Sequence, residues 1–239
     1  MDHTKTSLKR AIVKHFFDFF MLFLAVTLGF FVDNFRDSYS ANKTAHALAK
    51  DLVVDIAEDT TALHLLLIHC NIKLRKLDSL YMLIDDNKTV FNDSLIYYYS
   101  AYVGLRPWFE RNNITFEQLT DMGYLDYFTK SSAASLTDYD LACTKAIALL
   151  ENERQVLSGK IYPFQQQIFH TENFRSLIDS NKLLVKPELR NWNKDAQWLY
   201  HNYITEMKIT NSNIKLQYIH LLQKGKNTIS TLKKDYDIE

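Results

Sequence analysis

Hydrophobic residues are most concentrated near the amino end of the chain, where residues 16–32 contain a single charged side chain, Asp18. Together with residues 12–13 this stretch approaches the roughly 20 residues that a membrane-spanning helix requires. A cleaved signal peptide would have an apolar core of about 7–15 residues and a small-residue cleavage site after it, and no such site follows here. We therefore expect an uncleaved transmembrane helix over residues 12–33.

The charges that flank this stretch differ between its two sides. The residues before it include Lys5, Lys9, Arg10 and Lys14, and those after it include Asp33, Arg36 and Asp37. By the positive-inside rule, the short tail 1–11 stays in the cytoplasm and residues 34–239 form an extracytoplasmic domain. In a bacterium this arrangement predicts an inner-membrane protein whose carboxyl-terminal domain is periplasmic.

The position of Asp18 indicates which face of the span is special. At about 100° per residue, one helix face carries Lys14, Asp18, Leu22, Ala25 and Gly29. Ala25 and Gly29 form a small-xxx-small pattern, which lets a second helix approach closely. An ionisable side chain at this depth is costly in lipid, so we expect the face to contact a protein partner. The alternative is that Asp18 extends to the cytoplasmic headgroups and pairs with Lys14.

Beyond the span, the apolar pattern is that of a long helix. Residues 35–84 contain neither proline nor glycine, and apolar or small residues recur at intervals of three, four and seven. This helix either continues the span or kinks at residues 33–40, and the sequence leaves both possibilities open. Acidic residues on its early turns are interpreted as a solvated face: Asp51, Asp55, Glu58 and Asp59.

Two further long helices have the same periodicity, over residues 137–174, with a kink at Pro163, and over residues 187–236. The whole chain contains only 5 glycines and 3 prolines, which leaves little room for hairpin turns. No segment alternates as a strand would. We predict an all-α protein, in which one N-terminal transmembrane helix precedes an elongated antiparallel helical bundle.

Short helices are expected between the long ones. An aromatic helix over residues 95–105 would be capped by Asp93 or Ser94. The sequence from Thr115 to Gln118 fits a capping box, and Gly123 is a suitable helix stop.

Two local motifs resemble those of a protein family. The span ends in Asp33-Asn34-Phe35, and the middle of the chain reads Thr115-Phe116-x-x-Leu119-x-x-Met122-Gly123-x-Leu125. In these features the chain resembles the single-pass membrane proteins of Bacteroidota that carry a domain of unknown function, although they have tryptophan in place of Phe35 and serine in place of Met122. The resemblance implies a membrane anchor followed by helices, and it implies no activity.

Charge and motifs argue against several function classes. Lysine plus arginine equals aspartate plus glutamate, at 28 each, so the basic excess typical of a nucleic-acid-binding protein is missing. The sequence contains no glycine-rich phosphate loop, nucleophile elbow, dinucleotide fingerprint or Glu-x-x-His motif. We therefore expect no enzyme activity and no cofactor. A composite metal site formed by His64, His170 and His201 on separate helices is left as an alternative.

The two cysteines, Cys70 and Cys143, both fall on inward-facing stripes. We interpret them as buried free thiols. A disulfide between two helices is the alternative, because the predicted compartment is oxidising.

An aromatic cluster around residues 97–109 is the most unusual local feature. It is interpreted mainly as core packing, and the alternative is a recognition surface, since tyrosine and tryptophan favour interfaces. The residues assigned to that surface are Tyr98, Tyr102, Trp108 and Phe109.

These expectations favour a non-catalytic, membrane-anchored helical subunit. It would dock on a membrane or envelope protein complex, or associate with copies of itself. The alternative is a periplasmic small-molecule sensor. Such a sensor would have to signal through a membrane partner, because a cytoplasmic tail of about a dozen residues is too short for an output domain.

Overall fold

The computed structural model describes residues 3–84, 92–106, 108–180 and 182–239, with side chains at Phe16 and from Phe19 onward. Every regular element in these ranges is a helix, which confirms the predicted all-α class. In chain order the elements are α1 (His3–Leu83), α2 (Asp93–Ala101), α3 (Ile114–Asp121), the 3-10 turn η1 (Tyr124–Tyr127), α4 (Lys130–Val156), the π-turn η2 (Leu157–Ile161), α5 (Tyr162–Ile168), α6 (Glu172–Ser180) and α7 (Lys194–Asp235).

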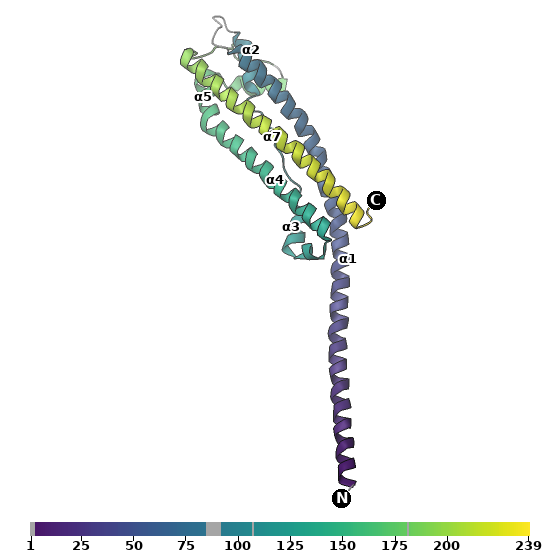
Figure 1. Ribbon diagram of the computed structural model, residues 1–239. Coiled ribbons are helices and arrows are strands. Elements are labelled where there is room, and N and C mark those ends of the chain that lie inside the picture. The colour runs from purple at the N-terminus through teal and green to yellow at the C-terminus, as the bar shows by residue number, and fades with distance from the viewer. Residues whose placement is uncertain (1–2, 85–91, 107, 181) are drawn as a thin grey trace.

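Helix α1 is continuous over 81 residues, so the apolar stretch and the first long helix of the domain belong to one helix, on the order of 120 Å along its axis. The axis changes direction where the helix joins the domain (Figure 1). The helix assignment is not interrupted at residues 33–40. The segment contains no proline or glycine, and Arg36 lies 3.7 Å from Asp33 on the preceding turn. Nothing in the backbone chemistry therefore interrupts the helix there.

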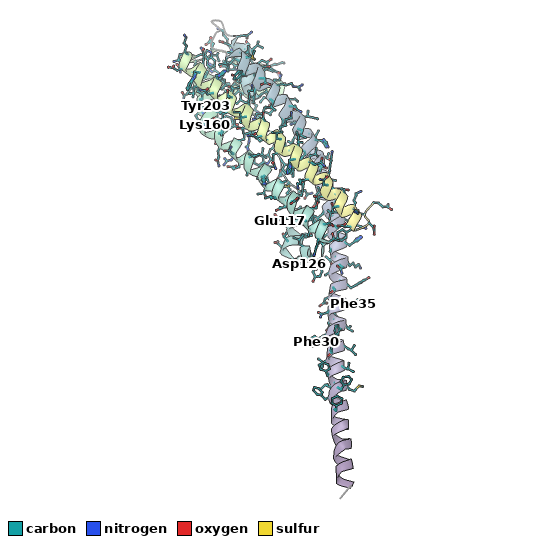
Figure 2. All side chains as sticks on the ribbon, in the orientation of Figure 1. Phe30, Phe35, Glu117, Asp126, Lys160 and Tyr203 are labelled. Atoms are coloured by element: carbon teal, nitrogen blue, oxygen red, sulfur yellow. The ribbon has the colours of Figure 1, made fainter. Side chains whose placement is uncertain are left out.

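The first half of α1 projects away from the rest of the protein. We call residues 19–40 the stalk, because none of its side chains is buried. Phe30 and Phe35 are 68% and 76% exposed and extend from the bare helix (Figure 2). Among the described residues, one helix, the apolar start of α1, is long and apolar enough to cross a membrane, and none of that stretch is buried within the protein.

Beyond the stalk, α7 lies alongside both α1 and α4 (Figure 1). The end of α1 contacts the beginning of α7, where the rings of Tyr81 and His201 are 4.1 Å apart. The beginning of the packed part of α1 contacts the end of α7, where the rings of His46 and Tyr236 are 5.9 Å apart. Helix α7 also packs along α4, and the short helices α2, α5 and α6 cover the end of the domain farthest from the stalk.

Helices α1 and α7 approach closely at Gly225. A Cβ atom there would lie 2.8 Å from Thr60 Cγ2 and 3.2 Å from the ring of Tyr139. A Cβ at 2.8 Å would force Thr60 to shift, so the close packing, rather than the backbone conformation, favours glycine here.

The core consists of two hydrophobic clusters along the length of the domain. The proximal cluster, nearer the stalk, is built around Leu52, Leu63, Leu136, Leu150 and Leu221. The distal cluster is built around Leu77, Ile96, Ile161, Tyr200 and Met207.

Between the two clusters lie three fully buried polar residues, one from each long helix: Lys73, Glu153 and Asn211. We call this set the polar layer. In each helix the polar residue stands between the last residue of one cluster and the first residue of the other, as Lys73 does between Cys70 and Leu77. The hydrophobic core is therefore divided at one level.

The expected boundaries of two long helices need correction. The helix predicted from residue 137 begins at Lys130, because the side chain of Thr129 accepts a hydrogen bond from the Ser132 N–H and caps it. The helix predicted from residue 187 begins at Lys194 and is capped in the same way by Asn193. Both caps are residue types that favour this position.

At the predicted kink near Pro163 the structure has the π-turn η2, which ends two residues before the proline. Proline has no N–H to donate and its ring clashes with the carbonyl four residues earlier. The N–H of Tyr162 therefore bonds to Leu157 O, one residue farther back than in an α-helix. The helix resumes as α5, and it ends at Ile168 rather than at residue 174.

Among the short helices, the predicted capping box was wrong. Helix α3 begins at Ile114, so Thr115 lies inside it and is buried, and the preceding Asn113 makes no capping bond with its side chain. Helix α2 is capped by Asn92 rather than by Asp93 or Ser94, through its bond to the Leu95 N–H.

The helix stop at Gly123 is confirmed. Its φ of +67° lies in the left-handed region, where a residue without a Cβ is least strained.

Candidate functional site

A connecting segment, residues 102–106 and 108–113, contacts both α1 and α4, and we call it the strap. Its contact with α1 is polar. The Asn112 N–H donates to Asp59 Oδ1 at 2.9 Å, and its side-chain amide donates to Asp55 and to Glu58, each at 3.1 Å. The solvated-face interpretation was therefore wrong for Asp59, which is only 3% exposed.

Asp59 also links α1 to α4. The hydroxyl of Tyr139 donates to Asp59 Oδ2 at 2.7 Å. Burial raises the pKa of Asp59, although the hydrogen bonds from Asn112 and Tyr139 and the nearby Arg111 charge oppose that shift. The carboxylate is thus a buried joint between two helices and the strap.

Two arginines fix the strap to α4. Arg111 pairs with Asp140, and Arg106 donates to the carbonyl of Leu150 at 3.1 Å. Arg106 also lies 3.8 Å from the carboxylate of Glu153 in the polar layer. The strap is therefore attached to α4 by the side chains of two arginines.

At the centre of the polar layer, Lys73 Nζ donates to Glu153 Oε1 at 2.8 Å, and both side chains are completely buried. Burial lowers the pKa of Lys73, against the opposing effect of the Glu153 charge. Because neither ion has access to solvent, each depends on the other for its charged state. The pair joins α1 to α4 in the interior of the domain, which is a structural role.

The aromatic cluster is engaged by cations of the chain itself. The ammonium of Lys76 on α1 donates to the hydroxyl of Tyr98 at 2.7 Å and lies 5.1 Å from the centre of the Tyr102 ring. The hydroxyls of Tyr98 and Tyr102 lie 3.5 Å apart. The hydrogen bond from Lys76 lowers the pKa of Tyr98, and the hydrogen bond with Tyr98 raises the pKa of Tyr102 to about 12.

The other two members of the predicted recognition surface differ from each other. Trp108 is 44% exposed, and the guanidinium of Arg106 lies 4.6 Å from its ring centre. Phe109 is 1% exposed and belongs to the proximal cluster. Its assignment to an exposed surface is therefore corrected, because the strap turns this ring into the core.

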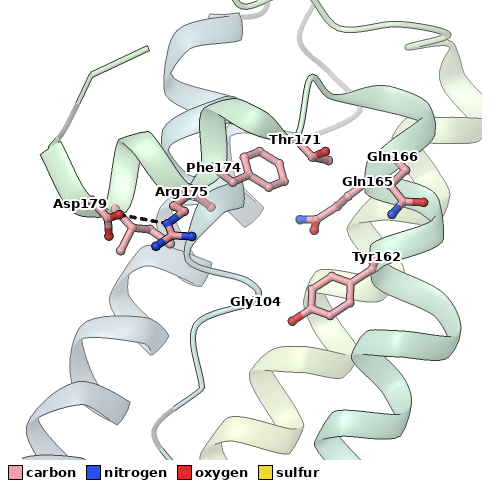
Figure 3. A pocket seen from close by; sticks show the side chains of 10 residues that line it. Gly104, Tyr162, Gln165, Gln166, Thr171, Phe174, Arg175 and Asp179 are labelled. Carbon is pink, nitrogen blue, oxygen red and sulfur yellow. Dashed lines mark hydrogen bonds and ion pairs between the residues drawn. The ribbon is translucent and has the colours of Figure 1, made fainter. Parts of the chain in front are cut away.

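A pocket of about 420 Å³ lies at the far end of the domain, between α2, α5 and α6 (Figure 3). Tyr162 and Phe174 face it from opposite sides, and Arg175 pairs with Asp179 at its edge, at 3.4 Å. The amide of Gln165 in its wall already donates to Ser100 O and to the hydroxyl of Tyr200. The pocket thus offers mainly aromatic and aliphatic surface to a ligand.

The predicted contact face of the span is only partly described. Leu22, Ala25 and Gly29 are exposed, and a Cβ at Gly29 would meet no atom within 4 Å. The side chains of Lys14 and Asp18 lie outside the described residues, so their membership of this face stays a prediction.

A second exposed apolar face lies on α1 within the domain, and sequence reasoning missed it. Val54, Leu65 and Ile68 are 56%, 59% and 54% exposed. Beside them runs a groove of about 740 Å³, bounded on its far side by Ile229 and Lys233 of α7. The signal in the sequence was a second apolar stripe on the same helix, in addition to the one that faces the core.

The cysteines are unbonded, and two histidines of the suggested metal site have other contacts. Cys70 and Cys143 are both buried free thiols, as expected. His170 contacts the guanidinium of Arg190, and His201 stacks on Tyr81. Within the described part of the chain, no group of three or more His, Cys, Asp or Glu side chains could hold a metal ion.

Comparison with protein-family models, with curated proteins and with solved structures found no match for this chain.

Proposed function

We propose that the protein is a single-pass membrane protein whose helical domain is a non-catalytic interaction module. The observation that carries this proposal is the continuity of α1, which runs from an apolar stretch with no internal packing into the centre of the domain. Apolar side chains that no part of the protein covers are stable in a bilayer and costly in water. A rigid helix would hold the domain at a fixed distance from that bilayer.

In this proposal the domain is an elongated antiparallel bundle of α1, α4 and α7. The contacts of Tyr81 with His201 and of His46 with Tyr236, at opposite ends of the same helix pair, support it. The basic residues before the span favour a cytoplasmic amino end, an inner-membrane location and a periplasmic domain. The resemblance to the Bacteroidota family agrees with this topology.

Two features of the domain agree with an interaction role: its buried charges are paired inside the core, and apolar side chains are exposed on its surface. The ionisable groups that are buried, such as Lys73 and Glu153, are already paired with each other. Within the part of the chain that the structure describes, no element covers the exposed face at Val54, Leu65 and Ile68. Exposed, contiguous apolar surface is typical of protein–protein contact. We propose that the partner is a membrane or envelope protein complex, or another copy of the chain.

Membrane anchoring is tested by adding charge to two matched pairs of residues. Leu24→Arg with Leu28→Arg places two charges in the stretch proposed to span the bilayer. Each charge raises the free energy of membrane insertion by about 3 kcal/mol. Ile209→Arg with Leu216→Arg replaces exposed residues of α7 and serves as the control. We expect only the first variant to be released from membranes by alkaline carbonate. Release of the unchanged protein would refute the anchor.

Orientation and partnership need separate measurements. A carboxyl-terminal alkaline phosphatase fusion should be active, whereas a fluorescent-protein fusion that matures only in the cytosol should give signal only if the topology is reversed. Mild-detergent purification followed by native mass spectrometry should show a stable partner or a defined oligomer. A monomer without bound protein at native expression would contradict the interaction role.

The distal pocket supports a second candidate function, the binding of a small amphipathic molecule. Its volume, near 420 Å³, is in the range of ligand sites, and its wall is largely apolar. A thermal-shift screen of metabolites would show a raised midpoint for a ligand. Thr171→Trp, at the pocket, should abolish that shift, and Thr137→Trp, on an exposed turn of α4, should not.

A further inference from the structure

The exposed face of α1 within the domain is a continuous helical stripe. Its members are Val54, Thr61, Leu65 and Ile68, which recur at intervals of seven, four and three residues, and all are exposed. The neighbouring groove against α7 gives this stripe a concave edge. A second helix could therefore pack along it for about four turns.

The same stripe continues the small-residue face of the stalk. Ala25 and Thr61 are separated by about ten helical turns, and so are Gly29 and Leu65. Because α1 is one uninterrupted helix, residues separated by whole turns lie on the same side of it, although its axis changes direction where it joins the domain (Figure 1). One side of α1 therefore carries small residues in the apolar stretch and exposed aliphatic residues in the domain.

Charged residues flank this stripe with opposite signs. In helical projection, Lys43 and Lys50 lie on one side of Val54, and Asp51 and Glu58 lie on the other side. All four are exposed. The basic side continues onto α7, where Lys233 lines the groove.

We propose that this face is the contact between two copies of the chain, which pack α1 against α1 in parallel and in register. Around a two-fold axis parallel to the helices, the acidic side of one copy meets the basic side of the other. Asp51 of each copy then faces Lys50 of its partner at the same height. In an antiparallel pair the acidic sides would face each other, as would the basic sides.

The charge pattern is the reason for choosing a second copy over an unrelated partner, because the stripe is complementary to itself in one orientation only. That orientation is also the one that a shared membrane imposes on two identical anchored chains. The inference therefore rests on the proposed anchoring, and it identifies the partner that the interaction role leaves open.

Disulfide trapping in membrane vesicles tests the contact with the full-length chain. Leu65→Cys places a thiol on the stripe, and Leu141→Cys places one at a similarly exposed position on α4. The native thiols are fully buried, so the unchanged protein gives the background. Because an interface holds two thiols at an effective concentration on the order of millimolar, we expect at least about fivefold more cross-linked dimer from Leu65→Cys. Equal yields from the two variants would overturn the proposal.

A charge exchange tests the parallel register. In the Leu65→Cys chain, Lys50→Glu alone and Asp51→Lys alone should each lower the dimer yield about two- to fivefold, because each creates like-charge pairs. The two changes together should restore the yield. Failure of the double variant to recover, or cross-linking of Leu65→Cys to a different protein, would refute self-association.

The same vesicles are extracted with carbonate, which separates the two possible failures. Protein that stays in the membrane without cross-linking refutes only the α1–α1 contact. Protein that is released refutes the anchor and the proposed function with it.

Discussion

The buried ion pair of the polar layer gives the sharpest test of how this domain is held together. Lys73 and Glu153 are 2.8 Å apart, and neither has any exposed surface. Replacing Lys73 with methionine keeps the length of the side chain and leaves the carboxylate of Glu153 buried without its partner. Removing one member of a buried pair typically costs about 3–5 kcal/mol of unfolding free energy.

The structure places the expected value near the lower end of that range. The guanidinium of Arg106 is 3.8 Å from Glu153 and only 23% exposed, so it compensates part of the lost charge. We therefore expect Lys73→Met to lower the free energy of unfolding by about 3 kcal/mol. For a domain of this size, that corresponds to a decrease of roughly 6–12 °C in the melting temperature.

Replacing both partners should have a different outcome. In the Lys73→Met, Glu153→Met double variant no charge is left unpaired in the core, and two apolar chains of similar size join the proximal and distal clusters. Such replacements are often neutral or stabilising, by about 1–4 kcal/mol. We expect the double variant to be at least as stable as the original protein.

The measurement is urea unfolding of the full chain in detergent, followed by tryptophan fluorescence, because all three tryptophans lie in the domain. The control is Lys160→Met, which breaks the Lys160–Glu206 pair, with the same 2.8 Å separation but 50% and 36% exposure. Its effect should be below about 1 kcal/mol. If Lys73→Met were equally mild, or if the double variant were as unstable as the single one, the reasoning would be wrong.

Three further predictions concern other parts of the domain. Gly225→Ala should cost about 1–3 kcal/mol in urea unfolding, because its methyl group would overlap α1, whereas Gly159→Ala, with no atom within 4 Å, should be neutral or slightly stabilising. Cys70 and Cys143, whose thiol pKa values burial raises to about 11 and about 12, should resist maleimide in the folded protein at pH 8 and react fully in urea. Because burial raises the pKa of Asp59, the folded protein binds this proton more tightly than the unfolded chain. We therefore measure the unfolding free energy of the unchanged protein minus that of Asp59→Asn. This difference should increase as the pH falls from 7 toward about 4, and a difference that stays constant with pH would contradict the raised pKa.

The long helices were predictable because their stability comes from apolar periodicity, which is local in sequence. The helix predicted over residues 137–174 does bury an apolar stripe, through Ala142, Ala146 and Leu150. The helix starts were less well predicted, although Thr129 and Asn193 are both favourable cap residues. Apolar spacing identifies where a helix must pack and says little about the polar turn at its end.

The strap was beyond prediction, because its position depends on partners far away in the chain. Arg111 pairs with Asp140, and Asn112 bonds to residues of α1 that precede it by more than 50 positions. No periodic pattern marks such a segment. It also explains why Phe109 is buried, since polar contacts on each side of this residue hold the strap against the core.

The polar layer was also missed by the sequence analysis, but a comparison of two helices could have identified it. In α1 the apolar criterion selects Leu74 as the inward residue between Cys70 and Leu77, whereas the buried residue is Lys73. Considered alone, a lysine at that position would cost several kcal/mol to bury, so a single-helix argument rejects it correctly. The rejection fails because Glu153 carries the opposite charge at the equivalent place in α4. Opposite charges at inward positions on two different helices therefore indicate a buried ion pair. When one helix is considered alone, its charged residue is wrongly assigned to the surface.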